Sequence, residues 1–333
     1  MSATHWAARS RAMLRTAMGP TIAAALADSE VIEIMVNPDG RLWLDRLGNG
    51  RHDTGLIVEA AQVDRIIRLV ASHARSEAHP GAPIVSAELP PHAEGAGERF
   101  EGVLPPVSTA PCFSIRKPAA RIHTLLDYVK DGIMTADTAR ILAMAVIERR
   151  NILVVGGTSS GKTTLANALL AEMGDLDERV ILLEDTRELQ CAGRDVVALR
   201  TRTVGANGPG TVTMADLVRS TLRLRPDRII VGEVRGREAL DMLKAWNTGH
   251  PGGIATIHAN SAPAALYRLE QLIQEAVVTV PRRLIAGAVD LIVFISGRGL
   301  ARRVETVARV AGLDPDGGYG LVDLASPQTQ AGE

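Results

Sequence analysis

The stretch "GGTSSGKTTLANALL", residues 156–170, decides the fold. Gly156 and Gly161 bracket four residues ahead of Lys162 and Thr163, which is the spacing of a phosphate-binding loop. The apolar run "NILVV" precedes this stretch and a helix-forming segment follows, so the loop joins a buried strand to a helix. A glycine turn without function is the alternative, but the strand and helix on either side favour nucleoside triphosphate binding.

Each residue type in the loop has a chemical role. The glycines let backbone N–H groups curl around the β-phosphate, Lys162 offers charge to the β- and γ-phosphates, and Thr163 offers a hydroxyl to Mg²⁺. The positive end of the following helix dipole adds to the attraction. The residues expected to bind the nucleotide are Gly157, Thr158, Ser159, Ser160, Gly161, Lys162, Thr163 and Thr164.

Length and composition are those of a globular protein with two domains. The chain has 333 residues, of which 46% are hydrophobic and 23% charged, and a net charge of −1 gives no overall attraction to nucleic acid. Its longest apolar runs, such as residues 289–295, are too short to span a bilayer, and residues 1–19 lack a signal-peptide core. Cys112 and Cys191 are too few for a disulfide framework, which fits a reducing cytoplasm.

The first part of the chain predicts a small α/β domain, residues 1–117. "VIEIMVNPDGRLWLDRL" alternates apolar and polar residues around the turn at 37–40, which predicts a hairpin. Apolar residues at helical spacing follow over 63–74, and the Pro- and Gly-rich stretch 77–115 ends in the strand-like "CFSIRKP". Residues 118–136 show no strong periodicity and are expected to form a linker.

Residues 137–333 alternate helical and apolar segments. A helix is predicted near 137–150 and a strand over 151–155, followed by the strands "RVILLE", "RIIVGE" and "GIATIHA" with helices between them. "LIVFI", "RRVETVARV" and "GYGLVDL" are expected to be closing strands. Such alternation predicts a mostly parallel sheet with helices on both faces and a ligand at the carboxyl ends of its strands.

Two strand ends offer the carboxylate that Mg²⁺ and the attacking water require. "DRIIVGE" ends in Glu233, but Gly232 stands where many P-loop enzymes have Asp. "RVILLED" ends in Glu184 and Asp185, whose alternative role is a helix N-cap or a solvated turn. The P-loop in the same predicted sheet favours the functional interpretation.

A histidine and three arginines are further candidates. "ATIHAN" places His258 at the end of a third strand, although a lone histidine is usually only a satisfied polar group. Arg219, Arg223 and Arg225 lie on or after one predicted helix, where a solvated face is the default. Alternatively, one of them acts as an arginine finger in a neighbouring subunit.

Taken together, these motifs resemble those of the secretion ATPases that power type II secretion, type IV pili and type IV secretion. "GGTSSGKTT" resembles their Walker A motif, "LLEDTREL" their Asp box, "IIVGEVRG" their Walker B motif and "TGHPGGIATIHANS" their His box. "IMVNPDGRLWLDR" and "FSIRKP" are similar to the conjugative-transfer ATPases called TrbB. A four-cysteine zinc motif and the longer N-terminal part of type II secretion ATPases are missing from the sequence.

The resemblance implies a RecA-like ATPase domain behind a smaller α/β domain, with Lys162 among the catalytic residues. It implies that Glu184 activates water while Thr163 and Glu233 hold Mg²⁺, and the reverse assignment of the two glutamates stays open. His258 would sense the γ-phosphate. Arg116 of "SIRKP" would reach the nucleotide from the first domain, so that ATP binding closes the two domains and hydrolysis releases them.

The function implied by the resemblance is a hexameric ATPase, cytoplasmic and peripheral to the inner membrane. It would bind inner-membrane proteins of a type IV secretion or conjugative DNA transfer system and drive pilus assembly and export. A type IV pilus motor is an alternative. Trp6 and nearby arginines permit a peripheral membrane contact.

Two other function classes stay open on the sequence. A hexameric nucleic-acid translocase needs a basic lining with stacking aromatics; aromatics are only 3% of residues, although "RTRTVGANGPGTVT" is a candidate ring-facing loop. Direct binding of nucleic acid is therefore left open. A nucleotide-gated scaffold that hydrolyses little ATP is the third class.

Overall fold

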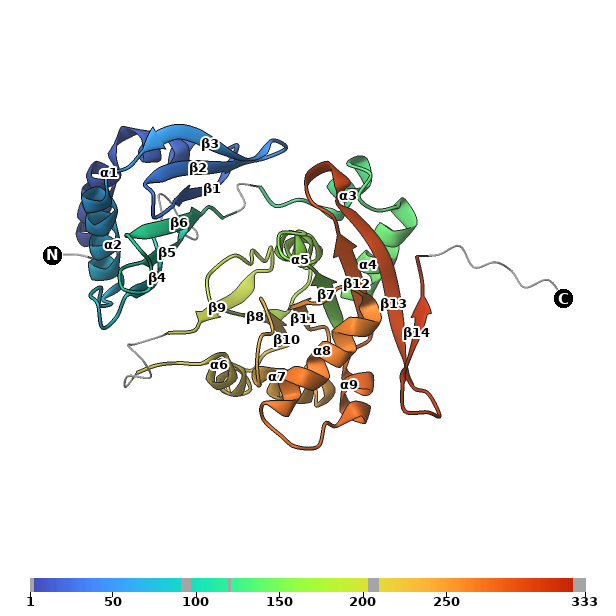
Figure 1. Ribbon diagram of the computed structural model, residues 1–333. Helices are drawn as coiled ribbons and strands as arrows, with labels where there is room; N and C mark the ends of the chain where they lie inside the picture. Colours follow the sequence, from blue (N-terminus) through green and yellow to red (C-terminus); the bar gives the residue numbers. More distant parts are fainter. Residues whose placement is uncertain (1–2, 91–96, 119–120, 203–209, 326–333) are drawn as a thin grey trace. The chain divides into compact units, whose positions relative to one another are not determined.

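The protein contains two separate β-sheets. The computed structural model describes residues 3–90, 97–118, 121–202 and 210–325, with side chains from residue 11 onward. One sheet belongs to a compact unit that contains residues 3–118 and also 210–211, and the other to a unit formed by 121–202 and 212–325 (Figure 1). Part of the predicted ring-facing loop, residues 203–209, and the side chain of Trp6 lie outside the described part.

The N-terminal unit is built on a sheet with the order β3-β2-β1-β6-β5-β4, in which neighbouring strands are antiparallel. The predicted hairpin is confirmed as β1 and β2, and the turn needs Gly40 because φ is +80° and a methyl group there would lie 2.8 Å from the Val58 carbonyl oxygen. The elements are α1 (Ala3–Ala27), β1 (Val31–Val36), β2 (Arg41–Arg46), β3 (Gly50–Ile57), α2 (Ala60–Ala74), β4 (Ile84–Glu88), β5 (Arg99–Val103) and β6 (Cys112–Arg116).

Both helices of this unit pack into the core of its sheet. The predicted apolar stripe of α2 is buried from Val63 to Ala71, whereas Ala74 at the end of the helix is exposed. Helix α1 is kinked at Gly19 and Pro20, which lets Leu14 and Ile22 enter the same core. β4 and β5 lie within 77–115, the stretch in which only the last strand was predicted. In the described part of the chain, none of the helices has the length and apolar character needed to cross a membrane.

The C-terminal unit confirms the mostly parallel sheet. Its strand order is β14-β13-β12-β7-β11-β10-β8-β9, and the pairs from β12 to β9 are parallel, while β13 and β14 are antiparallel. The elements are α3 (Leu125–Lys130), α4 (Ala136–Ile147), β7 (Ile152–Gly156), α5 (Lys162–Ala171), β8 (Arg179–Glu184), β9 (Asp195–Arg200), α6 (Met214–Thr221), β10 (Arg228–Val231), α7 (Glu238–Asn247), β11 (Ile254–His258), α8 (Ala262–Gln274), α9 (Arg282–Ala288), β12 (Leu291–Ser296), η1 (Gly299–Ala301), β13 (Arg303–Leu313) and β14 (Tyr319–Asp323).

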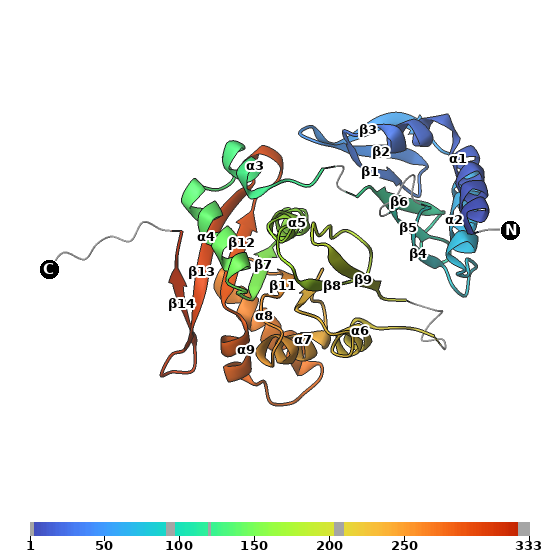
Figure 2. The same cartoon turned by 180° about the vertical axis from the view of Figure 1, so that it is seen from behind.

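Helices cover both faces of this sheet, as the two opposite views show (Figures 1 and 2). Side chains alternate along β7, so Ile152 and Val154 join a core with α3, α4 and α5, while Leu153 and Val155 join a core with α6 to α9. The stretch expected to be a linker contains α3, which begins with a capping box between Thr124 and Asp127.

Candidate active site

The P-loop connects β7 to α5 through a backbone that only small residues permit. A methyl group on Gly156 would lie 2.4 Å from the Ile295 carbonyl oxygen and 2.5 Å from Ser160 Oγ. Gly161 has φ +96° and Ser159 has φ 62°, so the loop takes the left-handed region twice. The backbone between β7 and α5 thus depends on glycine at both Gly156 and Gly161.

Lys162 lies at the centre of the site. Its side chain is buried, and Nζ donates a hydrogen bond of 3.0 Å to the Gly157 carbonyl oxygen. Nζ also lies 3.3 Å from both ring nitrogens of His258. The two residues meet because β7 and β11 are parallel neighbours in which Gly156 pairs with His258. The structure thus brings together two predicted site residues that are distant in sequence.

Glu233 extends this group beyond the end of β10. Its Oε1 lies 2.9 Å from Nε2 of His258, and its Oε2 accepts a hydrogen bond from Arg235. Burial and the charge of Lys162 lower the pKa of His258, against the opposing effect of Glu233. A neutral imidazole is thereby favoured, which can donate to one neighbour and accept from another.

Glu184 is buried at the end of β8, with 3% of its surface exposed. Its Oε1 accepts hydrogen bonds of 2.8 Å from the backbone N–H groups of Glu188 and Leu189. Burial raises the pKa of Glu184 to about 7, although those two hydrogen bonds lower it. Asn167 of α5 fixes the same loop through the Glu188 carbonyl and the Gln190 N–H, each at 2.9 Å.

The glycine at the unusual Walker B position has a steric reason. β8 and β10 are parallel neighbours, and the N–H of Gly232 donates to the Leu183 carbonyl oxygen at 2.8 Å. A methyl group on Gly232 would lie 3.0 Å from Cγ of Glu184. The space that an aspartate would need at position 232 is therefore filled by the carboxylate side chain of the neighbouring strand.

Arg235 is a site residue that the sequence analysis missed. Besides its hydrogen bond to Glu233, its Nη1 lies 3.7 Å from Oδ2 of Asp185. The other carboxylate oxygen of Asp185, Oδ1, accepts a 2.9 Å hydrogen bond from the Thr201 hydroxyl. The signal was available, because Arg235 follows the Walker B glutamate by two residues in "VGEVRG". It supplies a positive charge beside two carboxylates.

The other predicted binding residues surround this group or stay apart from it. Thr163 is half-buried in the first turn of α5, and Ser160 Oγ is buried with no partner in the described part of the chain. Arg116 is exposed at the end of β6 in the N-terminal unit. Arg219 pairs with Asp241 at 3.1 Å, whereas Arg223 is exposed.

The side chains of this site suit a magnesium ion that is bound mainly by phosphate and water, rather than one that is enclosed by protein ligands. The described residues include no group of three or more His, Cys, Asp and Glu side chains that could hold a metal. Mg²⁺ in nucleotide sites takes only one or two protein ligands together with phosphates and water. The Thr163 hydroxyl and the Glu233 carboxylate, both predicted from the sequence, are oxygen groups of the kind that such a site uses.

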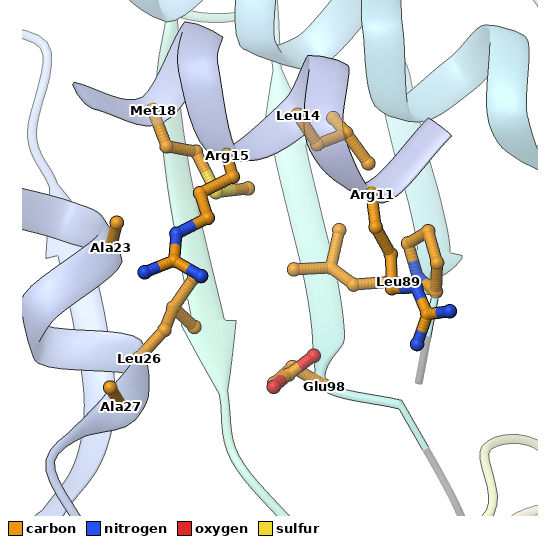
Figure 3. A pocket seen from close by; sticks show the side chains of 10 residues that line it. Arg11, Leu14, Arg15, Met18, Ala23, Leu26, Ala27, Leu89 and Glu98 are labelled. Carbon is orange, nitrogen blue, oxygen red and sulfur yellow. The ribbon is translucent and has the colours of Figure 1, made fainter. Parts of the chain in front are cut away.

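A hollow of about 250 Å³ lies in the N-terminal unit and contains none of the predicted site residues. Figure 3 shows Leu14, Met18 and Leu26 of the kinked helix α1 along its wall, with the charged groups of Arg15 and Glu98 beside them. It is separate from the P-loop group, whose residues all belong to the C-terminal unit.

Comparison with known proteins decides the family. The sequence profile described as "Type II/IV secretion system protein" matches residues 99–311. The chain belongs to the type II/IV secretion system protein family. Among the relatives of this family member, the "Conjugal transfer protein TrbB" of Rhizobium radiobacter is 49% identical over 301 residues, covering 90% of each chain. The chain is therefore TrbB-like, as the motifs predicted.

A more distant relative agrees with this placement, and a solved structure supports the fold. The "Type IV secretion system protein PtlH" of Bordetella pertussis is 35% identical over 318 residues, which cover 85% of this chain and 91% of PtlH. The crystal structure of the pilus retraction motor PilT with bound ADP has a TM-score of 0.58, 21% identity, and coverage of 91% and 80% of the two chains. This structural likeness confirms the RecA-like α/β fold.

Proposed function

We propose that this chain is an ATPase that powers conjugative DNA transfer through a type IV secretion system. The observation that carries the proposal is the group of Lys162, His258 and Glu233, which three neighbouring parallel strands bring together beside a P-loop. The TrbB and PtlH relatives support the secretion role by their names. A type IV pilus motor is the second candidate.

In the proposed mechanism, the backbone N–H groups of the P-loop and the Lys162 ammonium bind the β- and γ-phosphates of ATP. Mg²⁺, held by Thr163 and Glu233, would neutralise charge on those phosphates. The buried Glu184 carboxylate takes a proton from the attacking water, and neutral His258 contacts the γ-phosphate. The bond between the γ-phosphorus and its bridging oxygen breaks, which releases phosphate and ADP.

The working assembly that we propose is a homo-hexamer bound to inner-membrane proteins of the secretion complex. Arg116 of the N-terminal unit would contact the nucleotide when the two units close, and hydrolysis would release that contact. Arg223 and Arg225, exposed at and after the end of α6, are the proposed candidates for an arginine that acts on a neighbouring subunit's nucleotide.

The acidity of Glu184 predicts how the rate depends on pH. Its pKa is raised from 4.5 to about 7 by burial, and a general base must be ionised, so activity is lost as the pH falls through that value. We expect kcat/KM for ATP to fall about tenfold per pH unit below roughly pH 7 and to level off above it. Steady-state rates between pH 5.5 and 9 measure this. A flat profile over that range would remove Glu184 from the base role.

A transfer assay in cells tests the proposed function. A strain that carries a conjugative plasmid without its own copy of this gene is supplied with the wild-type chain or with Glu233→Gln. We expect the wild type to restore plasmid transfer and Glu233→Gln to lower it about 10²-fold or more, because hydrolysis drives transport. Normal transfer by Glu233→Gln would favour a scaffold, and no rescue by the wild type would contradict the conjugative role.

A further inference from the structure

Arg302 packs against the P-loop from the connection between β12 and β13. It stands between η1 and β13, and none of the four family motifs includes it. A methyl group on Gly161 would lie 2.9 Å from both Cζ and Nε of Arg302 and 3.3 Å from its Nη1. The guanidinium group therefore lies directly on the glycine that precedes Lys162.

The backbone holds Arg302 in this place from both sides. β12 pairs with β7 up to Phe294 and Val155, which brings the turn after β12 to the end of β7 where the P-loop begins. That turn is tight, because a methyl group on Gly297 would lie 2.2 Å from the Ala301 carbonyl oxygen. On the other side, the N–H of Val304 donates a 2.8 Å hydrogen bond to the Ile133 carbonyl oxygen.

The charge of Arg302 is not matched by the described residues. Its Nε is buried without a hydrogen-bond partner, and it forms no ion pair with a carboxylate in the described part of the chain. The hydroxyl of Tyr128 is likewise buried without a partner among the described residues. Burial raises the pKa of Tyr128, and the charge of Arg302 lowers it. A buried guanidinium N–H that lacks a partner is costly, so the arrangement suits an anion that arrives from outside the chain.

We propose that Arg302 binds the phosphate chain of the nucleotide in the same subunit. The P-loop N–H groups bring phosphate oxygens to the neighbourhood of Gly161, and the planar fork of N–H donors on arginine suits phosphate. This inference rests on the proposed nucleotide site. It adds to Lys162 a second cation, which comes from the connection between β12 and β13. Arg302 would link phosphate binding to β13 and, through Val304, to the connection between α3 and α4.

Nucleotide binding to the full-length protein tests the inference. Affinities for ADP and adenosine are measured by displacement of a fluorescent ADP analogue from the wild type, Arg302→Gln, Arg302→Lys and the control Arg309→Ala. Arg309 is an exposed residue of β13, the strand that begins directly after Arg302, so its loss removes the same charge away from the P-loop. We expect Arg302→Gln to bind ADP about 10- to 100-fold more weakly, since it loses a charge-assisted hydrogen bond. Arg302→Lys should recover part of this loss, and Arg309→Ala should bind like the wild type.

The outcomes separate this inference from the proposed function. Wild-type affinity for ADP in Arg302→Gln would overturn the role of Arg302, while ADP binding by the wild type would still support the nucleotide site. Equal losses for ADP and adenosine would place the contact on the base or ribose and overturn the phosphate assignment. Thermal unfolding without nucleotide checks the fold of each variant. A wild type that binds no ADP would overturn both proposals.

Discussion

Replacement of Lys162 by alanine should abolish both tight ATP binding and turnover. The ammonium group is buried, donates to the Gly157 carbonyl and lies beside His258, so no other side chain of the P-loop takes its position. A positive charge held beside the phosphates stabilises the negative charge that develops on them in the transition state. Its loss lowers kcat by about 10²- to 10³-fold, and weaker binding of ATP adds to the loss in kcat/KM. Phosphate release from ATP under steady-state conditions measures the effect.

A lysine outside the site provides the control for this prediction. Lys244 is exposed on α7, and Lys244→Ala removes the same charge from the same unit. It should hydrolyse ATP like the wild type. Turnover by Lys162→Ala within a factor of about three of the control would mean that the P-loop is not where hydrolysis occurs.

Replacement of Glu184 by glutamine should stop hydrolysis and leave ATP bound. Glutamine keeps an oxygen that can accept the N–H groups of Glu188 and Leu189, so the loop after β8 is retained. It cannot take a proton from water, and loss of a general base lowers the rate by about 10²- to 10⁴-fold. Nucleotide affinity should stay within about threefold of the wild type, which separates this variant from Lys162→Ala.

The same substitution has an expected effect on stability. Burial raises the folded-state pKa of Glu184 from its unfolded value of 4.5 to about 7, so the folded state loses stability as the pH rises between these two values, and the full penalty remains above them. Glu184→Gln removes that penalty, and its thermal midpoint at pH 8 should not fall below that of the wild type. Glu148→Gln, at an exposed position after α4, is the control for both measurements. Loss of ATP affinity together with a lower midpoint would show a structural role instead.

The core of the site could be predicted because it depends on local patterns and one topological rule. Each of Lys162, Glu184, Glu233 and His258 follows an apolar strand segment or the loop after one, and parallel strands present their carboxyl ends at one edge. The contact between His258 and Lys162 requires β7 and β11 to be neighbours in the sheet. The alternation of helices and strands predicts a parallel sheet but does not give that strand order.

Other features depend on pairing register and on packing that the sequence does not display. The reason for Gly232 appears only once β8 lies beside β10 and Glu184 fills the space. β4 and β5 lie in a stretch whose proline and glycine content predicts turns. Arg302 is the first residue of "RRVETVARV", which the sequence predicts only as a closing strand, and it is the pairing of β12 with β7 that brings Arg302 to Gly161.

The central claim is tested most directly by measuring ATP hydrolysis per subunit for the wild type, Lys162→Ala and Glu184→Gln. Nucleotide binding is measured on the same proteins, and both measurements cover a range of protein concentrations. The account predicts turnover by the wild type, background rates for both variants, and ATP retained by Glu184→Gln alone. A wild type no faster than Lys162→Ala at every concentration would contradict the claim that this P-loop hydrolyses ATP.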